Sequence, residues 1–242
     1  MPATTLNSTA LSRIALAAAL LLGAGLLASW RAPAGEQAAL IAAPVVDSPK
    51  SAGPAQTAVL SGGCFWGVQG VFEHVRGVRR VVSGYAGGAR GTADYGSVST
   101  GSTGHAESVQ ISFDPAEVSY GEILRVFFSV AHDPTQLNRQ GPDVGSQYRS
   151  EIFYSTPDQK RIAEAYIAQL DQAHAFARPI VTRVDSLPGF YPAEEYHQDF
   201  LVHNPSYPYI VFNDLPKIEN LKRVLPDYYV GRPVLLSNVI AH

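Results

Sequence analysis

The stretch AVLSGGCFWGVQGVFEHVRGVRRVVSGY, residues 58–85, decides the fold. It opens with a short apolar segment, Ala58–Leu60, that leads to two glycines, which predicts a strand followed by a tight turn. Apolar side chains then recur at helical spacing, which predicts a helix from Cys64 to Val75. A second strand is expected from Val78 to Tyr85. The resulting β-α-β unit places a cysteine where the first strand joins the helix.

The residues that follow complete an α+β domain. Further elements are expected as strands at 107–113, 150–154 and 180–184 and as helices at 120–131, 157–176 and 193–203. The order β-α-β-β-α-β, followed by α-β-α, predicts a ferredoxin-like split β-α-β core in which helices cover a mixed sheet as a second layer. Two long loops, residues 86–104 and 132–147, are candidates for a functional role because compact domains rarely carry such loops without one.

The two ends of the chain differ from this domain in composition. Residues 14–30 carry no charge, so residues 1–30 are expected to be either a cleaved secretory signal or an uncleaved membrane anchor. Either interpretation predicts an exported protein that is periplasmic, secreted or held at the membrane by that segment. Residues 31–56 contain eight Ala and four Pro and predict a flexible linker. Residues 226–242 are expected to be a C-terminal tail.

Charge and cysteine content exclude several classes of function. The chain has 18 basic and 21 acidic side chains, and this near balance argues against a nucleic-acid-binding protein. Its single cysteine excludes an internal disulfide and a cysteine-based metal cage. The His105-x-Glu107 and Glu194-x-x-His197 patterns lack the second halves of known metal sites, so no metal is expected.

Cys64 occupies a position that favours an anion. The free N–H groups and the dipole at the start of a helix stabilise negative charge, which predicts a lowered pKa and a reactive thiolate. The alternative is an inert, buried thiol. The adjacent aromatic residues Phe65 and Trp66 point about 100° apart on a helix, so one of them is expected to line the surroundings of the thiol unless both belong to the core. An aromatic wall beside a nucleophile suits an apolar group such as a methyl.

Glu107 is the second informative residue. It has the same strand parity as Val109, Ile111 and Phe113, so it should point to the buried face of the sheet. Burial raises the pKa of a carboxyl group, which suits a general acid. The alternative is a frayed strand end that leaves Glu107 in water.

A series of motifs along residues 57–225 resembles the peptide methionine sulfoxide reductases of the A type. The motifs are GCFWG (63–67), GYAGG (84–88), GSTGHAE (101–107), HDPTQ (132–136), GSQYRS (145–150) and EYHQ (195–198). The resemblance implies that residues 57–225 form a catalytic domain. The implied roles are Cys64 as the nucleophile, Glu107 as the acid, Phe65 and Trp66 as the wall around the substrate methyl, and Tyr95, Asp143 and Tyr148 as the groups that hold the sulfoxide oxygen and its water network.

The implied reaction converts methionine-S-sulfoxide, free or in proteins, to methionine without a cofactor. A thiolate attacks the sulfoxide sulfur while the oxygen is protonated, and Cys64 becomes a sulfenic acid. Many relatives carry a second, resolving cysteine, which this chain lacks. The reductant is therefore expected to be a thioredoxin-like protein, a small thiol or Cys64 of another molecule, and the enzyme itself a monomer. Pro142 also departs from the family pattern, which usually has Asn before the aspartate.

Three other classes of protein remain open from the residues alone. A cysteine hydrolase would need a histidine within hydrogen-bond reach of the sulfur. A thiol peroxidase would use Cys64 but would need neither the aromatic wall nor Glu107. A simple binding module would use no thiol chemistry at all.

Overall fold

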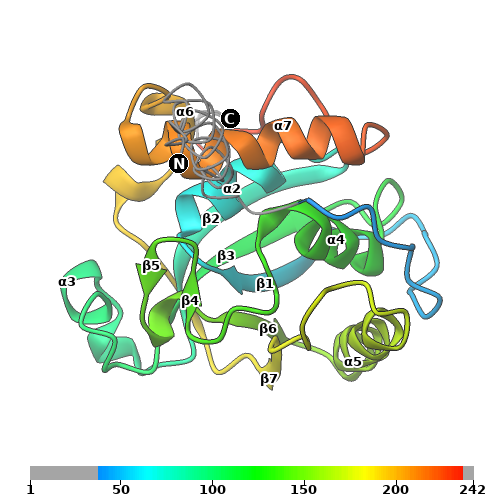
Figure 1. The fold of residues 1–242 in the computed structure, drawn as a ribbon, viewed down its shortest axis with the longest axis horizontal. Coiled ribbons are helices and arrows are strands. Elements are labelled where there is room, and N and C mark those ends of the chain that lie inside the picture. Colours follow the sequence, from blue (N-terminus) through cyan, green and yellow to red (C-terminus); the bar gives the residue numbers. More distant parts are fainter. Residues whose placement is uncertain (1–37, 237–242) are drawn as a thin grey trace, which may run out of the picture. The chain divides into compact units, whose positions relative to one another are not determined.

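A computed structural model describes residues 38–236 (Figure 1). The segment expected to be a signal or an anchor, residues 1–30, lies outside the described residues. No helix within residues 38–236 combines the length and the apolar character that a membrane crossing requires.

A six-stranded mixed sheet forms the centre of the domain (Figure 1). Its strands are β1 (Gln56–Gly62), β2 (Val78–Ala86), β3 (Ala106–Phe113), β6 (Ser150–Tyr154), β7 (Arg183–Ser186) and β8 (Phe190–Pro192). They lie in the order β7-β6-β1-β3-β2-β8. The four middle strands are antiparallel and have the strand order of a split β-α-β core, whereas β7 pairs parallel with β6. The predicted fold class is therefore confirmed.

The helices and the smaller elements connect these strands. The helices are α2 (Phe65–Glu73), α3 (Tyr95–Val98), α4 (Tyr120–Val126), α5 (Pro157–Gln172), α6 (Phe200–His203) and α7 (Leu215–Val224). A π-helical turn continues α4 over Phe127–Ala131, and another precedes α7 over Ile210–Asp214. The short strands β4 (Arg139–Gln140) and β5 (Asp143–Val144) form a hairpin within the second long loop.

Strand β1 is buried on both faces, which fixes the start of α2. Ala58 and Leu60 belong to the main core beneath the helices, whereas Val59 packs on the opposite face with Phe153 and Ala86. Alternate side chains of a strand point to opposite faces, so this apolar run anchors the strand from both sides. Helix α2 lies on β2 and β3 and also packs against α6 and α7. The glycine turn after β1 therefore lies in a rigid environment.

The prediction of a single helix at 193–203 is wrong. The chain instead forms β8, a 3₁₀ turn at Glu195–His197 and the short helix α6. The amide group of Gln198 provides the reason. It accepts a hydrogen bond from the Ser83 N–H at 2.9 Å and donates to the carbonyls of Ser83 and Ala193 at 3.0 Å each. These bonds hold the chain against β2 in an extended form.

The flexible linker expected over residues 31–56 is contradicted for residues 38–55. Ile41 is only 4% exposed and belongs to the main core. The carbonyl of Ala42 accepts a hydrogen bond from the Tyr166 hydroxyl at 2.7 Å. The Asp47 carboxylate accepts one from the Gly121 N–H at 2.8 Å, at the start of α4. Groups on α4 and α5 thus bind a segment whose composition alone predicts a flexible linker.

The described part of the C-terminal tail also packs on the domain. The N–H of Val230 donates to the carbonyl of His74 at 2.8 Å, and that of Val234 donates to the carbonyl of Glu73 at 2.9 Å. Carbonyls at the end of a helix have no partner within the helix. The tail residues satisfy these two carbonyls at the end of α2.

The packing of the N-terminal segment can be tested with two adjacent residues. Ile41→Ala should lower the free energy of unfolding by about 2–5 kcal/mol because it removes a buried side chain and leaves a cavity. Leu40 is 71% exposed, so Leu40→Ala should change it by less than about 0.5 kcal/mol. Urea denaturation of both variants measures the difference, and equal, small effects would show that the segment does not pack.

Candidate active site

Cys64 lies at the N-terminal cap of α2, directly after a glycine that the geometry requires. Gly63 has φ +90°, a conformation that side chains rarely adopt, and an added Cβ would lie 2.5 Å from the side chain of Gln140. The Cys64 residue as a whole is only 9% exposed. The Gly63–Cys64 turn therefore places the sulfur at the end of the helix, close to the protein surface but almost closed off from water.

Glu107 joins the thiol at the same end of α2. Its side chain is 4% exposed, and Oε2 accepts a hydrogen bond from the Phe65 N–H at 3.0 Å. The expected burial of this residue is confirmed. Burial raises the pKa of Glu107 to about 8, and the charges of Asp143 and Asp214 add to the effect, although the Phe65 N–H opposes it. The carboxyl group is therefore protonated at neutral pH.

The prediction of a lowered pKa for the Cys64 thiol is wrong. Burial raises the pKa of the Cys64 thiol well above its ordinary value, and the charges of Glu107, Asp214 and Asp143 raise it further. A hydrogen bond with the Trp66 N–H acts in the opposite direction, as expected at a helix start, but it is the smaller effect. Desolvation and neighbouring carboxylates thus outweigh the helix end.

The two aromatic residues after the cysteine have different surroundings. Phe65 is buried, and its ring centroid lies 5.0 Å from that of His197 and 5.9 Å from that of Tyr85. Trp66 is half-buried, stacks on Phe200 at 3.9 Å and donates from Nε1 to His197 Nδ1 at 3.2 Å. The indole plane is therefore fixed from two sides. Trp66 is the partly accessible member of the pair.

Tyr95 and Asp143 lie on the two flagged loops, and Tyr148 directly follows the second of them. The Tyr95 ring centroid lies 4.6 Å from that of His197, which also packs on Phe65. Burial, followed by Glu107, raises the pKa of Tyr95 and of Tyr148. Asp143, on β5, raises the pKa of both Glu107 and Cys64. All seven residues singled out from the sequence thus gather around one end of α2.

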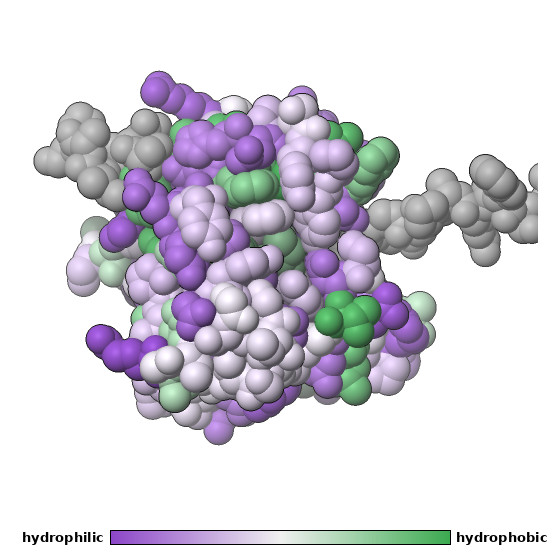
Figure 2. All heavy atoms as spheres, turned by 90° about the vertical axis from the view of Figure 1, so that its left-hand side faces the viewer, coloured by the Kyte–Doolittle hydropathy of each residue, from purple (hydrophilic) through white to green (hydrophobic). Residues whose placement is uncertain are grey.

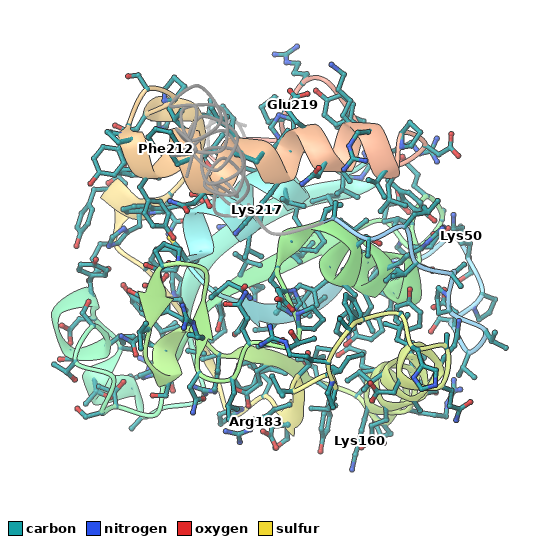
Figure 3. All side chains as sticks on the ribbon, in the orientation of Figure 1. Lys50, Lys160, Arg183, Phe212, Lys217 and Glu219 are labelled. Atoms are coloured by element: carbon teal, nitrogen blue, oxygen red, sulfur yellow. The ribbon has the colours of Figure 1, made fainter. Side chains whose placement is uncertain are left out.

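Three further residues at this end of α2 were not predicted. Tyr209 donates its hydroxyl hydrogen to Asp143 Oδ2, and its ring lies edge-on to Trp66 with the centroids 6.0 Å apart. Buried Asp214 lies beside Gly67, with Lys217 Nζ 3.6 Å from its Oδ1. In Figure 3 Lys217 points from α7 toward α2, whereas Glu219 points away. Only the helical periodicity of α7 could have indicated that Lys217 faces inward.

Figure 2 shows the side of the molecule that carries α3, the β4–β5 hairpin and α6. Much of this face has intermediate hydropathy, with apolar residues near its centre. Among the described residues, no group of three or more His, Cys, Asp and Glu side chains is placed to hold a metal ion. The chemistry available at this site is that of a thiol, a protonated carboxyl group and phenols.

A thiol and a protonated acid at one helix end are the two groups that a thiol-dependent enzyme with a proton-transfer step uses. The sequence matches the profile of the family "Peptide methionine sulfoxide reductase" over residues 56–227. It is 60% identical over 187 residues to peptide methionine sulfoxide reductase MsrA 2 of Mesorhizobium japonicum, covering 77% of this chain and 96% of that protein. The chain belongs to the peptide methionine sulfoxide reductase family.

Other relatives agree with this assignment. MsrA 2 of Synechocystis is 54% identical over 187 residues, which cover 76% of this chain and 87% of that protein. The structure of methionine sulfoxide reductase A of Corynebacterium diphtheriae matches with a TM-score of 0.55 at 32% identity, covering 72% of this chain and 90% of that one. Reduced Mxr1 from Saccharomyces cerevisiae matches with a TM-score of 0.57 at 30% identity, covering 65% and 91%.

The raised pKa of Cys64 can be tested by alkylation without substrate. At pH 7 the thiol should react with iodoacetamide more slowly than free cysteine, and its rate should still rise above pH 9 because the thiolate is scarce below that pH. The same protein unfolded in urea is the control, and its thiol should titrate near the ordinary value of about 8.5. A plateau in the rate below pH 7 would show a thiolate in the resting site.

Proposed function

We propose that this chain reduces methionine-S-sulfoxide, free or in proteins, to methionine, with Cys64 as the nucleophile and Glu107 as the acid. The observation that carries the proposal is the hydrogen bond from the Phe65 N–H to Glu107, which joins the acid to the residue next to the thiol. A sulfoxide requires both groups at one point, because its sulfur accepts the nucleophile while its basic oxygen accepts a proton.

The protonation states of the resting site suit this reaction. The Cys64 sulfur bonds to the sulfoxide sulfur while Glu107 protonates the oxygen, and the thiol proton then restores the carboxyl group of Glu107. Transfer of the hydroxyl group to Cys64 releases methionine and leaves a sulfenic acid. The substrate sulfur is reduced by two electrons and Cys64 is oxidised by two.

The remaining residues of the site hold the substrate. Tyr95 and Tyr148 keep their phenolic protons because burial raises the pKa of each, so they can donate to the sulfoxide oxygen. The half-buried indole of Trp66 provides an apolar surface for the methyl group.

A cysteine hydrolase fits the site less well. His132 uses its two ring nitrogens toward the Phe127 carbonyl at 3.1 Å and the Ser150 hydroxyl at 2.7 Å. His197 accepts the Trp66 N–H on Nδ1. Among the described residues, no histidine is hydrogen-bonded to the Cys64 thiol as a general base should be.

The proposal includes an external reductant and export. Since Cys64 is the only cysteine in the chain, a thioredoxin-like protein or a small thiol reduces the sulfenic acid. The uncharged run at 14–30 supports action outside the cytoplasm, either as a released protein or at the membrane, and the catalytic unit is proposed to be a monomer. N-terminal sequencing of the mature protein from fractionated cells tests the export.

Mass spectrometry of Cys64 tests the chemistry directly. After the protein is mixed with methionine-S-sulfoxide and no reductant, one oxygen atom should be added to Cys64 for each methionine released. Cys64→Ser is the control and should release none. Methionine release without oxidation of Cys64, or oxidation without methionine, would contradict the proposal.

Glu107→Gln tests the assignment of the acid. The amide that this substitution introduces can still accept the Phe65 N–H but has no acidic proton to give, so sulfoxide reduction near pH 7 should slow by about 10²–10⁴-fold. Glu73→Gln is a matched control, because Glu73 is another buried glutamate whose pKa burial raises, at the opposite end of α2. The assignment of Glu107 as the acid is wrong if the Glu107→Gln and Glu73→Gln variants catalyse sulfoxide reduction at the same rate.

A further inference from the structure

His197 lies among the aromatic rings of the site but has no role in the reaction as described above. Its side chain is 3% exposed and comes from the 3₁₀ turn between β8 and α6. The imidazole centroid lies 4.6 Å from that of Tyr95, 5.0 Å from that of Phe65 and 5.8 Å from that of Trp66. One ring therefore joins the loop that carries Tyr95 to the first turn of α2.

The hydrogen bond from Trp66 to His197 fixes the indole in a way that stacking does not. Trp66 stacks on Phe200 with the ring centroids 3.9 Å apart and an interplanar angle of 9°. Stacking sets the plane of a ring but defines its rotation within that plane only weakly, whereas a hydrogen bond is directional. Trp66 Nε1 donates to His197 Nδ1 at 3.2 Å. His197 therefore sets the rotation of the indole within its plane.

The imidazole can accept this hydrogen bond only while it is neutral. A neutral ring that accepts on Nδ1 carries its proton on Nε2. That nitrogen is buried, has no hydrogen-bond partner among the described residues and lies 4.0 Å from Glu194 Oε2. Burial lowers the pKa of His197, although the charge of Glu194 opposes the effect, so the ring is neutral at pH 7. Its Nδ1 lone pair is then available to Trp66.

The same turn also holds the substrate-binding loop. Glu194 Oε1 accepts a hydrogen bond from the Tyr95 N–H at 2.9 Å, at the start of α3. Its Oε2 accepts one from the Tyr85 hydroxyl, on β2, also at 2.9 Å. His197 is thus carried by a turn that is tied to both the sheet and α3, and its ring has a fixed place from which to hold Trp66.

We propose that His197 is a positioning residue for sulfoxide reduction, which holds the Trp66 indole in the orientation that binds the methyl group of the substrate. The inference rests on the proposed function, which assigns the indole to that methyl group. His197 acts through Trp66 and contacts neither reacting atom. Its loss should therefore weaken the binding of the sulfoxide and leave the chemical step, which belongs to Cys64 and Glu107, nearly unchanged.

Two substitutions of similar shape separate the hydrogen bond from the packing of the ring. The side-chain oxygen of His197→Asn can take the place of Nδ1 and accept the Trp66 N–H, whereas His197→Leu fills the space without an acceptor. Methionine release in a single turnover without reductant gives a half-saturating concentration of methionine-S-sulfoxide and a maximal rate. For His197→Leu that concentration should rise about 5–30-fold, the effect of one lost hydrogen bond, at a maximal rate within about 3-fold of the wild type. His197→Asn should restore the concentration to within about 3-fold of the wild-type value.

The indole N–H itself reports on the hydrogen bond without any substrate. Trp30→Phe leaves Trp66 as the only tryptophan, so its ¹⁵N-labelled indole gives one signal. Exchange of this N–H with solvent should be at least about 5-fold faster with His197→Leu than with His197→Asn. Should the Leu variant not fold, His197→Gln takes its place, because its amide group lies one carbon too far out to replace Nδ1.

His203→Leu is the matched control. His203 is an exposed histidine at the end of α6, so its variant should show the wild-type concentration, rate and exchange. Equal half-saturating concentrations for His197→Asn and His197→Leu would overturn the inference, and so would a loss confined to the maximal rate. A wild-type protein that releases no methionine would instead refute the proposed function, while the exchange of the indole N–H would still test the contact.

Discussion

The hydrogen bond from the Phe65 N–H to the Glu107 carboxyl group is the interaction on which the site depends. The first N–H groups of a helix have no partner within the helix. Helix α2 directs one of them, that of Phe65, to the acid, and the N–H of Trp66 opposes the rise in the pKa of the Cys64 thiol. The proton donor is therefore held by a peptide group of the same turn that carries the thiol.

This arrangement constrains the sequence around it. Gly63 turns the chain out of β1 with a positive φ, and Gly67 leaves room for a buried carboxylate, since a Cβ there would lie 2.1 Å from Asp214 Oδ1. A side chain at position 63 would be strained and would displace Gln140, and one at position 67 would displace the Asp214 carboxylate. The motif GCFWG is thus a packing requirement as much as a chemical one, because its glycines set the place of the thiol and its aromatic residues build the wall beside it.

The features that local periodicity determines were predictable, and those that arise from distant residues were not. Alternation in β3 was enough to place Glu107 on the buried face. The surroundings of Cys64 depend on Asp143 and Asp214, which no pattern near residue 64 reveals, so the helix-start argument gave the wrong direction for its pKa. The flexible linker predicted from composition was wrong for residues 38–55 for a similar reason, because their hydrogen-bond partners lie on α4 and α5.

The raised pKa of Cys64 fits the chemistry better than the expected thiolate. A reductase in this family needs a proton at the sulfoxide oxygen as well as electrons at the sulfur. Raised pKa values keep both Cys64 and Glu107 protonated, so the site already holds the proton that the oxygen accepts and the one that restores Glu107. A neutral thiol is also a poor target for peroxides and alkylating agents, since the thiolate is the reactive form. Such a thiol becomes a strong nucleophile only when a basic sulfoxide oxygen takes the proton of Glu107, because the carboxylate can then accept the proton of the thiol. A thiol peroxidase would need the opposite resting state, a thiolate that reacts without a proton supplied by the substrate site.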